Sequence, residues 1–180
     1  VNLAASLAAE GLRVLMIDLD PQGNATTVSG ITKKEALPTV YQLLIGAATL
    51  AEVCIKTDFG FDVLPANREL AGAEVELIDL SEREYRLKNA LQAGRASYDF
   101  ILIEGLLRTM FNAQSTLTQQ VSNELESHFG NKVYKTIVPR NVRLAEAPSY
   151  GKPVIAFDKN SKGAQAYTAL AKEILEKVAP

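Results

Sequence analysis

The chain alternates between continuous apolar runs and segments in which apolar side chains recur every three or four residues. The runs lie at 13–18, 61–65, 98–103, 105–111 and 133–139. Such runs are typical of strands buried on both faces, as in a parallel sheet covered by helices. Helical spacing occurs at 1–11, 39–46, 48–55, 66–77, 81–94, 116–130 and 161–178. This order predicts the α/β class: a layered, mostly parallel twisted sheet with helices on both faces.

End signals support several of these helices. Gly11 follows the first helical segment, where a left-handed residue commonly ends a helix. Ser161 stands directly before the last one, as an N-cap would, and Ser81 with Glu84 has the spacing of a capping box. No N-cap signal precedes the first segment, so we expect the domain to begin upstream of Val1.

One connection does not fit a parallel sheet. Only Glu104 separates the runs at 98–103 and 105–111, whereas parallel strands need a crossover of about a dozen residues or more. A single strand over 98–111 would exceed the usual length of roughly three to ten residues. We therefore predict one domain over 1–180, truncated at its amino end and missing a crossover near 103–105.

Composition excludes several classes of protein without selecting a partner. The 180 residues are 47% hydrophobic and 22% charged, as in a soluble globular domain and unlike collagen or a low-complexity chain. The net charge of -2 gives no global attraction to nucleic acid, so DNA binding would need a local basic patch. No stretch is long and apolar enough to span a bilayer. Cys54, the only cysteine, cannot form an internal disulfide bond.

The first candidate site follows the run at 13–18. Asp18 and Asp20 stand two residues apart at a strand's carboxyl end, where open α/β sheets collect ligands. Paired carboxylates there can hold Mg²⁺ or orient a water that attacks a phosphate. A strand-terminal turn, in which Asp18 accepts hydrogen bonds from nearby backbone N–H groups, explains the same residues equally well.

The second candidate site follows the run at 133–139. Pro139 fixes a turn, and Asn141 offers an amide that can pair with the edge of a base. Positive charge is supplied by Arg140, Arg143 and Lys152. A turn followed by the solvated start of a helix would have the same residues, and spacing alone favours that simpler interpretation.

Several catalytic motifs are absent from the 180 residues. There is no GxxxxGK[ST] loop, whose N–H groups would cradle phosphates, and no GxGxxG loop, which disfavours a dinucleotide-dependent oxidoreductase. GxSxG and HExxH are absent as well. His128 is the only histidine and has no Cys partner nearby, so we expect it to be structural or exposed.

The order of several long segments resembles the ParA/Soj family of chromosome- and plasmid-partitioning ATPases, of the deviant P-loop class that includes MinD. The segments are VNLAASLAAEGLRVLMIDLDPQGNAT, FDVLPANRELAGAEVEL, REYRLKNAL, YDFILI, GLLRTMF, IVPRNVRLAEAPSYGKPVIAFD and SKGAQAY. They cover most of the chain, and DLDPQGNAT with PRNVRLAEAPS is highly specific. The resemblance implies a single ParA-like nucleotide-binding domain.

The resemblance also implies roles for individual residues. Asp20 matches the hydrolytic aspartate that helps to position the attacking water, and Asp18 matches the carboxylate near Mg²⁺. Pro139 and Asn141 match the loop that holds adenine. Arg143 matches a basic residue implicated in nonspecific DNA binding. These roles require Asp20 and Asn141 to share one cleft.

The family's biology gives further expectations. Its members bind ATP and Mg²⁺, sandwich two ATP molecules in a homodimer, and bind DNA nonspecifically in that state. A ParB-type centromere-binding protein stimulates hydrolysis and releases the DNA, which drives chromosome or plasmid segregation. The resemblance therefore implies a cytoplasmic, nucleoid-associated bacterial protein without stable membrane insertion.

The chain departs from the family in three places. The KGGVGKTT loop would lie just before Val1, and the Walker B and switch II segment, roughly fifty residues long, would follow 98–103. Gln114 stands where the family often has an arginine thought to touch DNA. We expect the 180 residues alone to bind no ATP and to be poorly stable, since strand edges lose their partners. The alternative is a shortened, non-hydrolysing relative that acts as a binding or dimerisation module.

Overall fold

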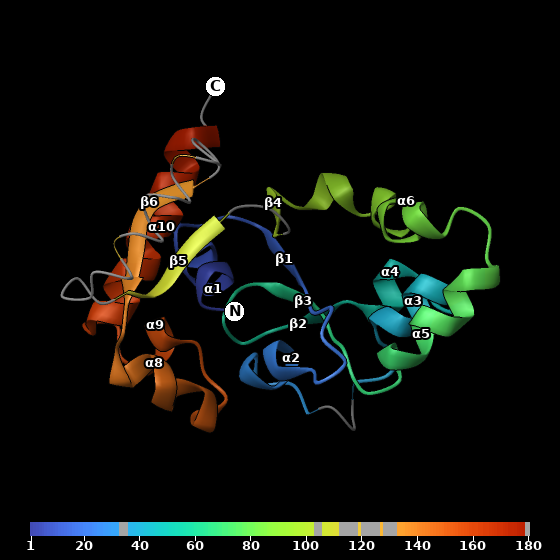
Figure 1. Ribbon diagram of the computed structural model, residues 1–180, viewed down its shortest axis with the longest axis horizontal. Helices are drawn as coiled ribbons and strands as arrows, with labels where there is room; N and C mark the ends of the chain where they lie inside the picture. The colour runs from blue at the N-terminus through green and yellow to red at the C-terminus, as the bar shows by residue number, and fades with distance from the viewer. Residues whose placement is uncertain (33–35, 103–105, 112–118, 120–126, 128–132, 179–180) are drawn as a thin grey trace.

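The computed structural model describes residues 1–32, 36–102, 106–111, 119, 127 and 133–178. Its strands are β1 Val14–Ile17, β2 Ile55–Lys56, β3 Asp62–Leu64, β4 Phe100–Leu102, β5 Leu106–Phe111 and β6 Val133–Pro139. Within these residues the strands form two sheets, one with the order β2-β3-β1-β4 and one with β5-β6 (Figure 1). Every pair is parallel except β2 with β3. The predicted α/β class with a mostly parallel sheet is confirmed.

Helices and short 3₁₀ turns connect the strands. The helices are α1 Asn2–Ala9, α2 Asn24–Val28, α3 Val40–Ile45, α4 Leu50–Val53, α5 Leu70–Glu76, α6 Arg86–Gln92, α8 Val142–Glu146, α9 Val154–Phe157 and α10 Lys162–Val178. The 3₁₀ turns are η1 Leu77–Asp79, η2 Arg83–Tyr85, η3 Arg95–Ser97 and η5 Ala147–Tyr150. In the described residues, no helix is both long enough and apolar enough to cross a membrane.

Strand β1 is buried on both faces, as its apolar run predicts. Leu15 belongs to a core with side chains of α3, α4 and α5. Val14 and Met16 belong to a second core with side chains of α1 and α10. Because successive side chains of a strand point to opposite faces, these two cores lie on opposite sides of the four-stranded sheet. Helices therefore cover both of its faces, and α1 and α10 lie on the side away from α3 and α5 (Figure 1).

Helix α10 holds strand β6 through a carboxylate. Glu173 accepts hydrogen bonds from the backbone N–H groups of Lys135 and Thr136, each at 2.7 Å. Burial opposes ionisation of Glu173, but these hydrogen bonds and the charge of Lys177, whose Nζ lies 3.5 Å from the carboxylate, outweigh it and lower the pKa of Glu173 to about 2. The ionised side chain thereby supplies acceptors that a neighbouring strand would otherwise provide.

Several predicted helix ends are confirmed. Gly11 has φ +85 and follows the end of α1, as a left-handed residue at a helix terminus should. Ser161 Oγ accepts a hydrogen bond from Ala164 N at 3.2 Å, so it caps α10. Cys54 is a free thiol, in line with its being the only cysteine.

Other predictions of local structure are wrong. The capping box of Ser81 and Glu84 does not form, because Glu82 takes φ 54 and becomes the N-cap of η2 while Glu84 pairs with Arg83. The helix predicted over 48–55 ends at Val53, since the following residues pair with β3 as strand β2.

The structure excludes a single strand over 98–111, in agreement with the argument from its length, because β4 and β5 belong to different sheets. The junction at 103–105 lies outside the described residues. The same holds for Gln114, His128 and most of the helix predicted over 116–130, of which positions 119 and 127 are described and helical.

Replacement of Glu173 by Gln is expected to lower the free energy of unfolding by about 1–2 kcal/mol at pH 7, because the amide keeps one acceptor oxygen and turns an NH₂ donor towards the other backbone N–H group. The carboxyl has a pKa of about 2 when folded, against an ordinary value of 4.5. Its contribution is therefore complete above about pH 4.5 and is lost as the pH falls towards 2.

Urea denaturation of both proteins at pH 7, 5 and 3 measures this difference. Lys172→Gln, an exposed change on the same helix, serves as the control and should change stability little at any of these pH values. A stability difference for Glu173→Gln that stays constant from pH 5 to pH 3 would contradict the assignment.

Candidate functional site

Asp18 lies at the carboxyl end of β1 and is 4% exposed. Its Oδ2 accepts from Thr26 N at 2.8 Å and from Thr26 Oγ1 at 2.7 Å, and its Oδ1 accepts from Asp20 N at 3.1 Å. A carboxylate has roughly four lone-pair positions, so one on Oδ1 remains for a further donor or a cation. The structure thus shows the strand-terminal turn at Asp18, and the role of this carboxylate toward Mg²⁺ stays a prediction.

Thr26 is the residue that fixes this carboxylate. Its side chain is fully buried, and its Oγ1 also accepts a hydrogen bond from Ala66 N at 2.9 Å. One hydroxyl thus joins Asp18, helix α2 and the loop that follows β3. The sequence pattern predicts a strand-terminal turn here and reveals neither α2 nor the role of Thr26, because nothing in the neighbouring residues shows that this hydroxyl is buried.

Asp20 is exposed, in contrast to Asp18. Its Oδ1 accepts from Gln22 N at 2.9 Å, which is the local turn expected of an aspartate at this position. The other carboxylate oxygen has no hydrogen bond to any described residue, so it can orient a water molecule. The pair at Asp18 and Asp20 thus combines one buried and one solvated carboxylate.

The second segment begins where β6 ends. Pro139 is the last residue of β6, and Asn141 is the N-cap of α8, with its Oδ1 accepting from Leu144 N at 3.3 Å. A Cβ atom at Gly163 would lie 2.6 Å from Leu144 Cγ and 3.1 Å from Asn141 Oδ1. Because glycine has no side chain, Gly163 lets α8 pack closely against the start of α10. This close packing holds the loop at Asn141 in place.

Arg143 lies on the exposed side of α8 and is bound by two carboxylates. Its Nη1 donates to Glu146 at 2.7 Å, and its Nε lies 3.4 Å from a carboxylate oxygen of Asp158. The hydrogen bond to Glu146 is the main reason that the pKa of Arg143 is raised. The guanidinium is half exposed, so another anion can reach it but must compete with these partners.

The two segments meet along one edge of the molecule. Helix α2 contacts η5, and a Cβ atom at Gly151 would lie 3.7 Å from the backbone oxygen of Thr27. Figure 1 shows α2 and α8 along the same lower edge. This contact joins the chain segments that follow Asp20 and Asn141, and a cleft shared by those two side chains remains a prediction.

The amino end of α1 contacts the chain that follows η5. Asn2 Oδ1 accepts a hydrogen bond from Val154 N at 2.8 Å, which joins α1 to the start of α9. Helix amino ends carry unpaired N–H groups and favour anions, so this position suits a negatively charged ligand.

The donor set at Asp18 and Asp20 fits Mg²⁺ better than a transition metal. Among the described residues, no group of three or more His, Cys, Asp or Glu side chains could hold a metal ion. Magnesium needs only one or two protein carboxylates when waters and phosphate oxygens supply its other ligands. The pair is therefore compatible with Mg²⁺ that is bound together with a phosphorylated ligand.

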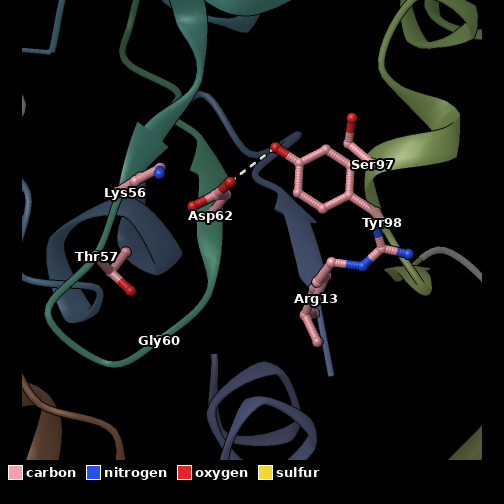
Figure 2. Close-up of a pocket in the computed structure, with 8 residues that line it drawn as sticks. Arg13, Lys56, Thr57, Gly60, Asp62, Ser97 and Tyr98 are labelled. Carbon is pink, nitrogen blue, oxygen red and sulfur yellow. Dashed lines mark hydrogen bonds between the residues drawn. The ribbon is translucent and has the colours of Figure 1, made fainter. Parts of the chain in front are cut away.

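A separate cleft of about 420 Å³ lies at the opposite, amino end of β1 (Figure 2). Tyr98 OH donates to Asp62 Oδ2 at 2.8 Å in its wall, and Arg13 forms an ion pair with Asp99 at 2.7 Å. The predicted site residues lie at the carboxyl ends of the strands, so this cleft is a different place in the fold.

The buried hydroxyl of Thr26 can be tested directly. Thr26→Val keeps the shape but leaves Ala66 N without an acceptor, and we expect it to lower the free energy of unfolding by about 2–3 kcal/mol. Thr26→Ser keeps the hydroxyl and loses a methyl group, so it should lower the free energy of unfolding by only about 1 kcal/mol. Urea denaturation at pH 7 compares the two, and equal losses would contradict the structural role of the hydroxyl.

Comparison with known proteins gives the family. A family profile described as an AAA domain matches residues 1–118. The sporulation initiation inhibitor protein Soj of Bacillus subtilis is 38% identical, with 97% of this chain and 90% of that protein aligned. The chromosome partitioning protein ParA of Caulobacter vibrioides is 35% identical, with 98% and 88% aligned. The Soj alignment spans 229 positions against 180 residues here, so at least 49 positions of Soj have no counterpart.

Solved structures agree on the fold. Cobyrinic acid a,c-diamide synthase from Mycobacterium smegmatis, solved with a bound ATP analogue and magnesium, superposes with a TM-score of 0.79 at 24% identity. The match covers 97% of this chain and 86% of that one. With the sequence relationship extending over nearly the whole chain, the protein belongs to the ParA/Soj family of chromosome-partitioning ATPases.

Proposed function

We propose that this protein acts in DNA segregation as a ParA-type ATPase that binds Mg-ATP, pairs as a homodimer around the nucleotide and binds DNA nonspecifically. One observation supports this most: helix α2, which follows Asp18 and Asp20, contacts η5 in the segment that follows Asn141. A nucleotide has a phosphate end and a base end, and these segments offer a partner for each.

Asp18 and Asp20 are proposed to serve the phosphate end. Asp18 is rigidly held and keeps one acceptor position, which suits a ligand of Mg²⁺ or of a magnesium-bound water. Asp20 is exposed with one oxygen unpaired by described residues, which suits a residue that orients the attacking water. A resident Mg²⁺ would neutralise charge on the transferring phosphoryl group.

Pro139 and Asn141 are proposed to serve the base end. Asn141 uses its oxygen as the cap of α8, so its NH₂ group is the part that can donate to a base edge. The loop is fixed by the close approach of Gly163, which favours a preformed site.

The phosphate cradle itself is not among these 180 residues, which is the main support for the alternative of a non-hydrolysing binding module. We propose that a crossover of the family is missing near 103–105. Two observations support this: β4 and β5 lie in different sheets although only three residues separate them, and at least 49 positions of Soj have no counterpart in this chain.

DNA and a ParB-type protein are the proposed partners. Arg143 is half exposed on α8 and can contact a DNA phosphate if it exchanges Glu146 or Asp158 for it. The family relationship supports the ParB-type partner, cytoplasmic location and nucleoid association.

The ATPase proposal predicts a difference between two proteins. The 180 residues alone should give no heat of Mg-ATP binding in isothermal titration, because phosphate binding in this class depends on the glycine-rich loop. A version that carries the corresponding Soj segments before Val1 and after residue 103 should bind Mg-ATP and show DNA-stimulated turnover. In that version, Asp20→Ala should remove at least about 99% of turnover and keep binding.

Asp58→Ala, an exposed change in a turn, is the matched control and should retain full turnover. Micromolar Mg-ATP binding by the 180 residues alone would overturn the dependence on the missing loop. Binding without turnover in the extended protein would instead favour the binding-module alternative.

The proposed role of Arg143 predicts that two substitutions that each remove one charge have opposite effects on DNA affinity in the extended, ATP-bound protein. Arg143→Gln should weaken binding to a mixed-sequence duplex and reduce the salt slope by about one. Glu146→Gln should strengthen binding, because it frees the guanidinium from its closest partner. Fluorescence anisotropy between 50 and 200 mM salt measures both, with Lys172→Gln as a remote control. Equal affinities for all variants would exclude Arg143 from the DNA interface.

A further inference from the structure

A second cleft, of about 450 Å³, lies in the helical layer between α3–α4 and η2–α6. These elements stand together at one end of the molecule, away from α8 and α10 (Figure 1). Its apolar lining includes Leu43, Leu50 and Ala90, and its polar lining includes Thr49, Ser81 and Arg86. The volume is within the usual range of small-molecule sites, and it shares no lining residue with the candidate nucleotide site.

Arg86 is the unusual member of this lining. Its Nε is out of contact with solvent and has no hydrogen-bond partner. A Cβ atom at Gly46 would lie 3.4 Å from its Nη1, so the guanidinium rests against the glycine that ends α3. An unpaired donor on a partly buried charged group costs free energy, which a bound anion would offset.

Neighbouring cations differ from Arg86 because each has a partner. Arg83 Nε lies 3.2 Å from Glu84, and Lys88 Nζ lies 5.7 Å from the ring centre of Tyr85. The one carboxylate in the lining, Glu82, accepts from Asn89 at 3.5 Å instead of pairing with Arg86. Within the described part of the chain, no acidic side chain pairs with the Arg86 guanidinium.

We propose that this cleft binds a carboxylate that carries a small apolar body, with the carboxylate on Arg86 and the body against Leu43, Leu50 and Ala90. The planar guanidinium fork matches a carboxylate in a bidentate manner. The apolar lining favours a carboxylate over a bare phosphate, which would need more positive charge around it. A free organic acid and the carboxyl terminus of a peptide share this chemistry.

The test uses the 180-residue protein and N-acetyl-L-leucine as the probe, followed by NMR titration at pH 7. Binding in the millimolar range is expected, with shift changes at residues of α3 and α6. N-acetyl-L-leucinamide has the same apolar body without the carboxylate and should bind at least about tenfold more weakly. Because this comparison needs no variant, it stands even where a substitution disturbs folding.

Two variants locate the carboxylate. Arg86→Gln should weaken binding of N-acetyl-L-leucine by about tenfold or more, whereas Lys88→Gln, on the same helix, should leave it unchanged. Thermal unfolding of each variant checks that it is folded. Equal binding of acid and amide, equal loss in both variants, or no binding at 20 mM probe would overturn the proposal.

The source of the carboxylate follows from one more titration. N-acetyl-Gly-Gly-Leu presents the same terminal group on a peptide. Binding tighter than that of N-acetyl-L-leucine supports the proposal with a peptide carboxyl terminus as the ligand. Equal or weaker binding supports it with a free acid as the ligand.

Discussion

The hydroxyl of Thr26 connects the ends of two neighbouring strands of the main sheet. It donates to Asp18 after β1 and accepts from Ala66 after β3. Because the group is buried, water cannot replace either hydrogen bond, and the positions of Asp18 and α2 depend on it. Helix α2 in turn contacts η5. Thr26 therefore also helps to place Asp18 and Asp20 relative to the chain segment that follows β6.

Two charged groups at this edge already have partners within the chain. Arg143 has two carboxylate partners, and the carboxylate of Asp18 receives three hydrogen bonds. Such groups are held in place before a ligand arrives, which reduces the entropy lost on binding. Arg86, far away between α3 and α6, is the contrasting case of a cation with no acidic partner in the described residues.

The sequence predicted the parts of the fold that depend on local patterns. The apolar run of β1, the left-handed Gly11 and the cap at Ser161 follow from rules that involve only a few neighbouring residues. Helix α2 was missed because a five-residue helix rich in Thr and Val has no strong local signal. The capping box at Ser81 was wrong because the backbone at Glu82 took a conformation that no local rule favours.

The site was predictable only in part, for the same reason. Two carboxylates after a buried strand mark Asp18 and Asp20 as candidates, but the burial of one and the exposure of the other depend on Thr26 and α2. The pairing of Arg143 with Asp158 joins residues 15 positions apart and needs the turn between α8 and α9. Contacts of this kind arise from tertiary packing and cannot be deduced from spacing.

Asn141 has a further chemical consequence. Its amide oxygen has two lone pairs, and the cap of α8 uses one of them, so Asn141 keeps two donor hydrogens and one acceptor position. Adenine offers an acceptor at N7 beside the donor of its N6 amino group, whereas guanine offers acceptors at N7 and O6. In the proposed site, Asn141 would therefore pair with adenine through both of its polar groups but with guanine through its donors only.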